Sequence, residues 1–263
     1  MKRIGGLMLA GLLVTMQPAS AGLIGYYTFE ASDGTDSSGS GNHGTVGSAV
    51  GFTAAGLGVD GGVAGSFSDA TGTTNMIGLP IDIRAETHPT LTMGAFVTKT
   101  PGTSTKAKFL SHDNGGFDRT LGTDFRGGSA AGAYAAFTGV GVFNSGIVPA
   151  MTGYDFVAVR YNAAGTMTLT VNGVHTSTVD NTDFNVGFSQ LFIGGNPGFN
   201  EDWVGLIDNV FVYDELLSDA ELAAIQQARG VPGFSSGQAP EPVSLALIGG
   251  GLMAMTRLAR RRR

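Results

Sequence analysis

Cysteine is absent from the 263-residue chain, which excludes a disulfide framework, a cysteine zinc site and a thiol nucleophile. Charged residues make up only 14% of the sequence, against roughly a quarter in ordinary soluble proteins. The four histidines never lie three or four positions apart, so a helix-borne metalloprotease motif is excluded as well. The 43 glycines follow no three-residue period, which rules out collagen.

The N-terminal residues have the pattern of a secretion signal. Lys2 and Arg3 precede an apolar run over residues 4–16. The small residues Ala19-Ser20-Ala21 then stand where a signal peptidase cuts. We therefore predict that residues 1–21 form a signal helix, which is removed when the protein is secreted.

The C-terminal residues combine three features in a fixed order. Pro240-Glu241-Pro242 is followed by an uncharged, mostly apolar stretch over residues 243–256 and then by a cluster of arginines. The stretch is short for a hydrocarbon core that is roughly 30 Å thick. We predict a transmembrane helix that anchors weakly or temporarily in the inner membrane, with the arginines on the cytoplasmic side.

This tail resembles the PEP-CTERM sorting signal of exopolysaccharide-producing Gram-negative bacteria. In that family an exosortase reads the tail and removes it, so the resemblance implies an exosortase as a processing partner and the cell surface as the destination. A plain C-terminal membrane anchor is the alternative. The residues that carry the resemblance are Pro240, Glu241, Pro242, Arg260, Arg261, Arg262 and Arg263.

The body between the two ends is acidic. The whole chain has a formal net charge of −6. Seven of its 15 basic residues lie in the leader and the tail, whereas only one of its 21 acidic residues does. Because an acidic surface repels phosphate groups, we expect neither nucleic acid nor anionic lipid to be a partner of the body.

Residues 22–239 show no tandem repeat and no break in composition. Short apolar runs rich in Val, Ile, Thr, Phe and Tyr alternate with Gly, Asn and Asp, which is typical of an all-β domain. We predict strands over residues 23–29, 65–67, 75–79, 90–98, 108–111, 133–137, 156–161, 166–171, 174–179, 191–194 and 204–213.

Two local patterns within this body are specific. Residues 166–171 alternate strictly between Thr and an apolar residue, and Asn172-Gly173 follows, the dipeptide that a type I′ hairpin turn prefers. After the last strand, which is apolar on both faces, Ser218 and Glu221 form a capping box. We predict a hairpin at the first pattern and one short C-terminal helix at the second, packed against the sheets.

Five segments in this order resemble the LamG-like (concanavalin A-like) jellyroll domains. They are residues 23–30 with the loop 36–45, then 90–97, 156–161, 171–173, and 205–213 with the helix. The resemblance implies an antiparallel two-sheet jellyroll over residues 22–229, followed by a linker over 230–239 and the sorting signal over 240–263. Residues 113–150 match nothing in the family.

Hydrolysis is not expected from the sequence. Jellyroll hydrolases carry a Glu-x-Asp-x-x-Glu strand, whose spacing places two carboxyl groups on one face for retaining glycoside cleavage. No such strand occurs here, and no Gly-x-Ser-x-Gly nucleophile elbow is present in the required context. We predict no catalytic residues; the competing interpretation is an enzyme whose catalytic groups come from residues 113–150.

A calcium site is the chemistry that the family resemblance implies. Ca²⁺ takes six to eight oxygen ligands from carboxylates, amides and backbone carbonyls. The family positions map to Glu30, Asp36, Asn42 and Asp208, and we predict a structural calcium ion there. The alternative is that Asp36 and Asn42 only close turns while Asp208 is a hydrogen-bonded strand residue.

Carbohydrate binding requires aromatic faces or an amide-rich groove at the surface. The loop containing Asn196, Phe199 and Asn200 offers both, and a second candidate loop covers residues 113–119. For Trp203, the only tryptophan, we expect a position in the core, and a sugar-binding platform is the alternative. We interpret Lys99, Lys106 and Lys108 as a solvated strand edge that discourages aggregation.

These observations together predict a secreted binding or structural module at the cell surface or in exopolysaccharide. Its partner is expected to be extracellular polysaccharide or an envelope protein. An extracellular glycan-acting enzyme and a protein-binding adhesion module remain as alternatives, because one fold serves many functions.

Overall fold

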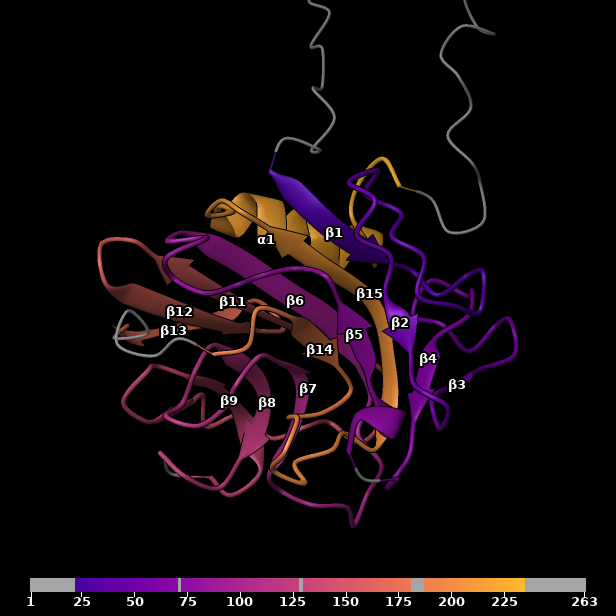
Figure 1. The fold of residues 1–263 in the computed structure, drawn as a ribbon, viewed down its shortest axis with the longest axis horizontal. Helices are drawn as coiled ribbons and strands as arrows, with labels where there is room; N and C mark the ends of the chain where they lie inside the picture. The colour runs from indigo at the N-terminus through magenta and orange to yellow at the C-terminus, as the bar shows by residue number, and fades with distance from the viewer. Residues whose placement is uncertain (1–21, 71, 128–129, 181–186, 235–263) are drawn as a thin grey trace, which may run out of the picture.

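A computed structural model describes residues 22–70, 72–127, 130–180 and 187–234 (Figure 1). Two antiparallel sheets of eight and seven strands face each other, and one short helix lies outside them. The predicted all-β sandwich is therefore confirmed. The predictions of a signal helix, a PEP-CTERM tail and a membrane helix fall outside the described residues. No helix within the described ranges is long and apolar enough to cross a membrane.

Sheet A contains the longest strands of the described chain. Its central strand β15 has β6 on one side and both β1 and β4 on the other. The strand order is β13 (Val174–Val179), β12 (Thr166–Val171), β11 (Asp155–Asn162), β6 (Leu91–Val97), β15 (Gly205–Tyr213), β4 (Gly65–Phe67) and β3 (Gly51–Phe52), with β1 (Leu23–Tyr27) paired to β15.

Sheet B is built largely from the middle of the chain. A single turn of 3₁₀ helix, η1 (Gly72–Asn75), precedes its strand β5. The strand order is β10 (Val142–Asn144), β9 (Ala133–Phe137), β8 (Thr120–Asp124), β7 (Ala107–Ser111), β14 (Leu191–Ile193), β5 (Ile77–Leu79) and β2 (Thr45–Val46).

All eleven predicted strands are present, with ends that shift by at most two residues. Four further strands, β2, β3, β8 and β10, were not predicted. β2 and β3 contain only two residues each. β8 has the sequence Thr-Leu-Gly-Thr-Asp, and all five residues are buried. It was not predicted because its sequence is not an apolar run, although the strand lies inside the protein.

The main core fills the space between the two sheets. It is lined by alternating apolar residues of both inner faces, among them Met167, Leu169 and Val171 of the predicted hairpin. Trp203 is fully buried in this core, as predicted, and its indole Nε1 donates a hydrogen bond to the Thr98 carbonyl at 3.0 Å.

A second core lies between the outer face of sheet A and helix α1 (Asp219–Ala228). Phe211 and Tyr213 of β15 pack there against Leu222 and Ile225 of the helix. This second layer explains why β15 is apolar on both faces. Figure 1 shows α1 lying across this sheet, on the side where β1 also runs.

Helix α1 begins and ends as its sequence predicts. The Ser218 hydroxyl accepts a hydrogen bond from the Glu221 backbone, and Glu221 in turn accepts one from the Ser218 backbone, which completes the capping box. The helix ends at Arg229, which adopts a left-handed conformation with φ of 58° just before Gly230. Residues beyond the helix still pack on the sandwich, since Val231 is buried and Phe234 lies edge-on to Tyr26.

The β12–β13 hairpin turns at Asn172 and Gly173, with φ values of 48° and 81°. Both central residues therefore have the positive φ of a type I′ turn. Asn172 also ties the turn to β11, because its side chain accepts a hydrogen bond from the Phe156 backbone and donates one to Asp155.

Gly173→Val is expected to lower the free energy of unfolding by about 1–3 kcal/mol, because valine is strained at positive φ. Asn172→Val should do the same and also remove the two bonds to β11. Urea denaturation measures both effects. Thr168→Val places the same side chain on the same hairpin at an ordinary strand position and should change stability by under about 0.5 kcal/mol. An equally stable Gly173→Val protein would contradict this turn.

Candidate functional site

Polar side chains are buried on the outer face of sheet B. The pairing of β7 with β8 shifts register between Lys108 and Leu110. Phe109 and Leu110 consequently both enter the core, whereas Lys108 and Ser111 belong to a polar layer on the other face. Two loops, residues 113–119 and 196–201, contribute the remaining members of this layer.

Lys108 is the cationic centre of this layer and is fully buried. Its Nζ lies 2.6 Å from Asp124 Oδ2 and 3.7 Å from Glu201 Oε2, and 4.8 Å from the centre of the Phe137 ring. Burial lowers the pKa of Lys108 below its usual value, against the opposing effect of the two carboxylates. Burial acts to raise the pKa of Asp124, but hydrogen bonds from Arg126 and the charge of Lys108 outweigh it and hold that pKa well below its usual range.

The prediction that three lysines form a solvated edge is wrong. Lys108 is fully buried and Lys99 is 5% exposed, with its Nζ 4.9 Å from the centre of the Trp203 ring. Only Lys106 is partly exposed, and it pairs with Glu201 at 3.0 Å. The prediction failed because β7 is an interior strand between β8 and β14, and Glu201 lies beside it, where its carbonyl accepts a hydrogen bond from the Lys108 backbone at 2.8 Å.

Asn196 joins the two loops to sheet B. Its side-chain oxygen accepts a hydrogen bond from Ser111 at 2.8 Å, and its amide donates to Asp113 at 2.8 Å and to Glu201 at 3.1 Å. Asn196 is only 1% exposed. Its role in the structure is therefore to position the loops, and its polar atoms are already engaged.

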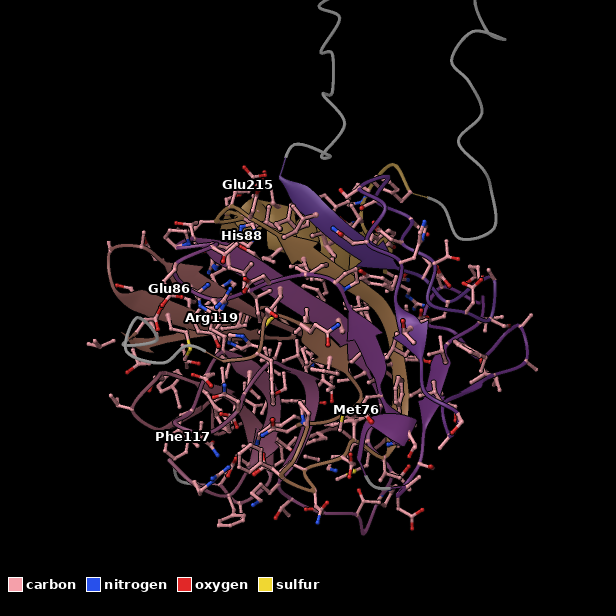
Figure 2. The ribbon with its side chains drawn as sticks, viewed as in Figure 1. Met76, Glu86, His88, Phe117, Arg119 and Glu215 are labelled. Atoms are coloured by element: carbon pink, nitrogen blue, oxygen red, sulfur yellow. The ribbon has the colours of Figure 1, made fainter. Side chains whose placement is uncertain are left out.

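The loop over residues 113–119 folds around its own carboxylates. Asp113 accepts hydrogen bonds from the backbone of Gly115 and Asp118, and Asp118 accepts one from the backbone of Asn114. Burial raises the pKa of Asp118 to about 6, and the nearby charges of Asp113 and Glu86 act in the same direction. Figure 2 shows Phe117 on the side of β8 and β9, at the far end of the molecule from α1.

The two loops meet at an aromatic surface. Phe199 is 41% exposed, and a Cβ on Gly115 would lie 3.9 Å from its ring. Beside them, the Arg126 guanidinium lies 5.5 Å from the ring centres of both Phe117 and Phe137, and one third of the Arg126 side chain is exposed. We call Asn114, Phe117, Arg126, Phe199 and Asn200 the loop surface.

Of the predicted ligand-binding residues, Phe199 and Asn200 are exposed and Asn196 is buried beneath them. The second candidate loop, residues 113–119, supplies Phe117, whereas Arg126 was not predicted as a site residue. Arg126 lies in the stretch that matches nothing in the family, and only the fold brings it to Glu201 of the other loop, at 3.3 Å.

Glu30 and Asp208 lie on either side of a loop over residues 58–63. Glu30 Oε1 accepts a hydrogen bond from the Val63 backbone at 3.0 Å, and Asp208 Oδ2 accepts one from the Val59 backbone at 2.7 Å. Asp208 is fully buried, and burial raises its pKa to about 8, helped by the negative charges of Asp60 and Glu30. These two predicted calcium ligands are therefore brought to one part of the molecule.

Asp36 and Asn42 lie elsewhere, along the free side of β1. Asp36 accepts hydrogen bonds from the backbones of Tyr26, Ser38 and Asn42, and the Asn42 amide donates to the Ile24 carbonyl. These contacts match the alternative role of closing a turn. The structure thus divides the four predicted calcium ligands into two pairs.

Among the residues that the structure describes, no three histidine, aspartate or glutamate side chains are grouped so that they could hold a metal ion. A calcium ion near Glu30 and Asp208 would therefore depend on backbone oxygens of the 58–63 loop as further ligands. The buried Asp208 carboxylate fits such an ion, because a cation would offset the negative charge that its surroundings disfavour.

Two solved structures illustrate the similarity in fold. Domain 4 of an extracellular arabinanase from Geobacillus stearothermophilus, solved with arabinotriose, is 16% identical with a TM-score of 0.58, covering 78% of this chain and 98% of that one. The binding domain of botulinum neurotoxin serotype D is 13% identical with a TM-score of 0.57, and the match covers 80% of this chain and 52% of that one. The chain thus spans about half of the toxin domain.

Sequence comparison defines the family. The model of the concanavalin A-like lectin/glucanases superfamily matches residues 60–223. The chain belongs to this superfamily, as its resemblance to the LamG-like domains predicts. No curated relative matches the chain.

Proposed function

We propose that the protein is a secreted, non-catalytic module that binds carbohydrate at the loop surface. The observation that carries this proposal is the junction of two loops, in which exposed Phe199 meets residues 113–119 above a buried polar layer. An exposed aromatic ring with neighbouring amides and a guanidinium suits the apolar faces and hydroxyl groups of a sugar.

The buried layer prepares this surface for binding. Lys108, Asp124 and Glu201 form ion pairs beneath the loops, and Asn196 hydrogen-bonds to both loops and to β7. Loops that are fixed before binding lose less conformational freedom when a ligand arrives, so more of the contact energy contributes to affinity. The arabinotriose complex of the similar arabinanase domain supports a carbohydrate ligand for this fold.

Phe199→Ala is expected to weaken retention on the bound polysaccharide by about tenfold, equivalent to ~1.4 kcal/mol. The measurement is affinity electrophoresis or calorimetry against a panel of soluble polysaccharides and arabinotriose. Leu216→Ala is the matched control, because Leu216 is 38% exposed but lies between β15 and α1. If Phe199→Ala, Leu216→Ala and the wild type were retained equally, Phe199 would not be part of the binding site.

Glycan hydrolysis is the second candidate function, and Asp118 is the observation that favours it. Its pKa of about 6 beside Asp113 is a property of catalytic acids. Both carboxyl groups, however, bind the backbone of their own loop and are at most 4% exposed. We therefore assign them a structural role; release of reducing ends by the wild type, abolished in Asp118→Asn, would establish an enzyme instead.

We further propose that Glu30 and Asp208 hold a structural calcium ion together with backbone oxygens of the 58–63 loop. When bound, the ion would supply positive charge beside two carboxylates and would fix this loop against β15. The buried Asp208 and its acidic neighbours support the proposal. Asp36 and Asn42 are left out of this ion's ligands, because their hydrogen bonds hold the turn beside β1.

Sorting to the cell surface is proposed from the two ends of the sequence. Residues 1–21 would be removed on secretion, and an exosortase would remove the tail that begins near Pro240 after transient inner-membrane anchoring. Phe234, the last residue described, packs on Tyr26 beside α1, whereas the loop surface lies over sheet B. A chain attached through this end would therefore present its loop surface away from the attachment point.

Mass spectrometry of the protein recovered from the surface of its own cells tests this maturation. The expected product starts at Gly22 and ends before the arginine cluster, and deletion of Pro240-Glu241-Pro242 should leave the tail in place. A recovered chain that retains its apolar stretch and arginines would identify a plain membrane anchor.

A further inference from the structure

Strand β13 is an edge strand of sheet A, and its outer edge is open as far as the described residues show. In the strand order of the described chain, nothing follows β13 on its outer side. Four of its six residues are exposed and none is buried, with Val174 and Val179 at 53% and 62% exposure. An exposed edge strand presents unpaired backbone N–H and C=O groups that can pair with another strand.

The hydrogen bonds of the hairpin show which residues face outward. Val171 and Val174 flank the two-residue turn and form its first hydrogen-bonded pair. The same alternation makes Gly165 and Asp180 a bonded pair, and the Asp180 backbone does donate to the Gly165 carbonyl at 3.0 Å. The backbone groups of His175, Ser177 and Val179 therefore point away from β12.

β13 lacks the features that usually protect an edge. Its sequence Val-His-Thr-Ser-Thr-Val contains no lysine, acidic residue or proline, and its pairing with β12 has no bulge. The other edges within the described ranges are short or covered. β2, β3 and β10 contain two or three residues, and the loop with Asp36 and Asn42 covers the free side of β1.

We propose that two copies of the chain associate by antiparallel pairing of β13 with β13, centred on Ser177. This register makes Ser177 face the partner's Ser177 and His175 face the partner's Val179, so that all three outward-facing residues pair through their backbones. Thr176 then lies opposite the partner's Thr178, and such threonine pairs stabilise antiparallel sheets.

A second copy suits this edge better than a charged partner, because the strand carries no formally charged residue and two copies do not repel each other there. The dimer would join two A sheets into one continuous sheet. It would leave both loop surfaces free, since these lie over sheet B. Because the dimer carries two loop surfaces, it would bind a repeating polysaccharide with higher avidity than a monomer.

A single engineered cysteine tests the pairing directly, because the chain contains no cysteine of its own. In the full-length Ser177→Cys variant, the two introduced cysteines would face each other across the symmetry axis. Their Cα atoms would be about 5.5 Å apart, a distance that a disulfide spans. We expect most of this variant to migrate as a covalent dimer on a non-reducing gel after mild oxidation.

Thr168→Cys is the matched control. Thr168 lies directly opposite Ser177 on the neighbouring strand β12, with the two hydroxyl oxygens 2.9 Å apart. Two copies of this position would be about 14 Å apart in the proposed dimer, too far for a disulfide. A Ser177→Cys chain that forms no more covalent dimer than Thr168→Cys would overturn the proposal.

Charge provides a second and independent test. Ser177→Lys places two like charges face to face, so its mass by light scattering should fall to that of a monomer while the wild type is a dimer. Ser177→Asp should behave in the same way, and an equal mixture of the two variants should recover the dimer. A wild type that is monomeric, or variants that remain dimeric when separate, would contradict pairing at β13.

Discussion

Lys108→Ala is expected to lower the free energy of unfolding by about 3–5 kcal/mol, which is the effect of removing one partner from a buried ion pair. The substitution leaves Asp124 and Glu201 buried at 0% and 3% side-chain exposure without their central cation. Urea denaturation measures the loss. Because Glu201 also anchors the 196–201 loop through Asn196, carbohydrate retention should weaken in the same variant.

Lys106→Ala is the control for this prediction. Lys106 pairs with the same Glu201, but one third of its side chain is exposed, so the substitution should cost less than about 1 kcal/mol. If both substitutions had the same small effect, the polar layer under the loops would not be the rigid base that the binding proposal requires.

Asp208→Asn is expected to change how stability depends on pH. The pKa of Asp208 is raised from 3.8 to about 8 in the folded chain, so folding takes up a proton between these values. The stability gained from this proton uptake is therefore fully present below the unfolded pKa of 3.8 and is lost as pH rises through the folded pKa of about 8. Asparagine keeps the shape without titrating, and the variant should lose less stability between pH 6 and pH 8 than the wild type.

The comparison with the variant isolates Asp208 from two other carboxyl groups. Burial also raises the pKa of Asp118 and Asp202 to about 6, so they act in the same direction but at lower pH. Calcium should restore stability to the wild type near pH 8, where Asp208 loses its proton, and should leave Asp208→Asn nearly unchanged. A melting temperature that is insensitive to both calcium and chelator would dismiss the calcium proposal.

Much of the fold follows from local patterns in the sequence. Alternation over residues 166–171 and the Asn172-Gly173 pair are sufficient for the β12–β13 hairpin, since a type I′ turn requires positive φ at both central positions. The capping box of Ser218 and Glu221 likewise fixes the start of α1. β8 could not be found in this way, because its buried Thr and Asp residues are stabilised by side chains of the neighbouring strand β7 and not by a local apolar pattern.

The site was less predictable than the fold for the same reason. The sequence of the 196–200 loop singles out Phe199, but the buried Asn196–Asp113 hydrogen bond that joins the two loops connects residues 83 positions apart. The positive charge of Lys108 also led to a wrong prediction, because a lysine is ordinarily expected at the surface. Its burial depends on Asp124 and Glu201, which only the packing of the loops on sheet B brings to it.

Hydrogen–deuterium exchange of the full-length chain, with and without an oligosaccharide that it retains, tests the location of the binding site most directly. The readout is the change in backbone exchange rate for each peptide of the chain. Binding at the loop surface should slow exchange in residues 113–119 and 196–201 and leave residues 58–63 unchanged. Protection confined to residues 58–63, or to any surface other than these two loops, would contradict the account.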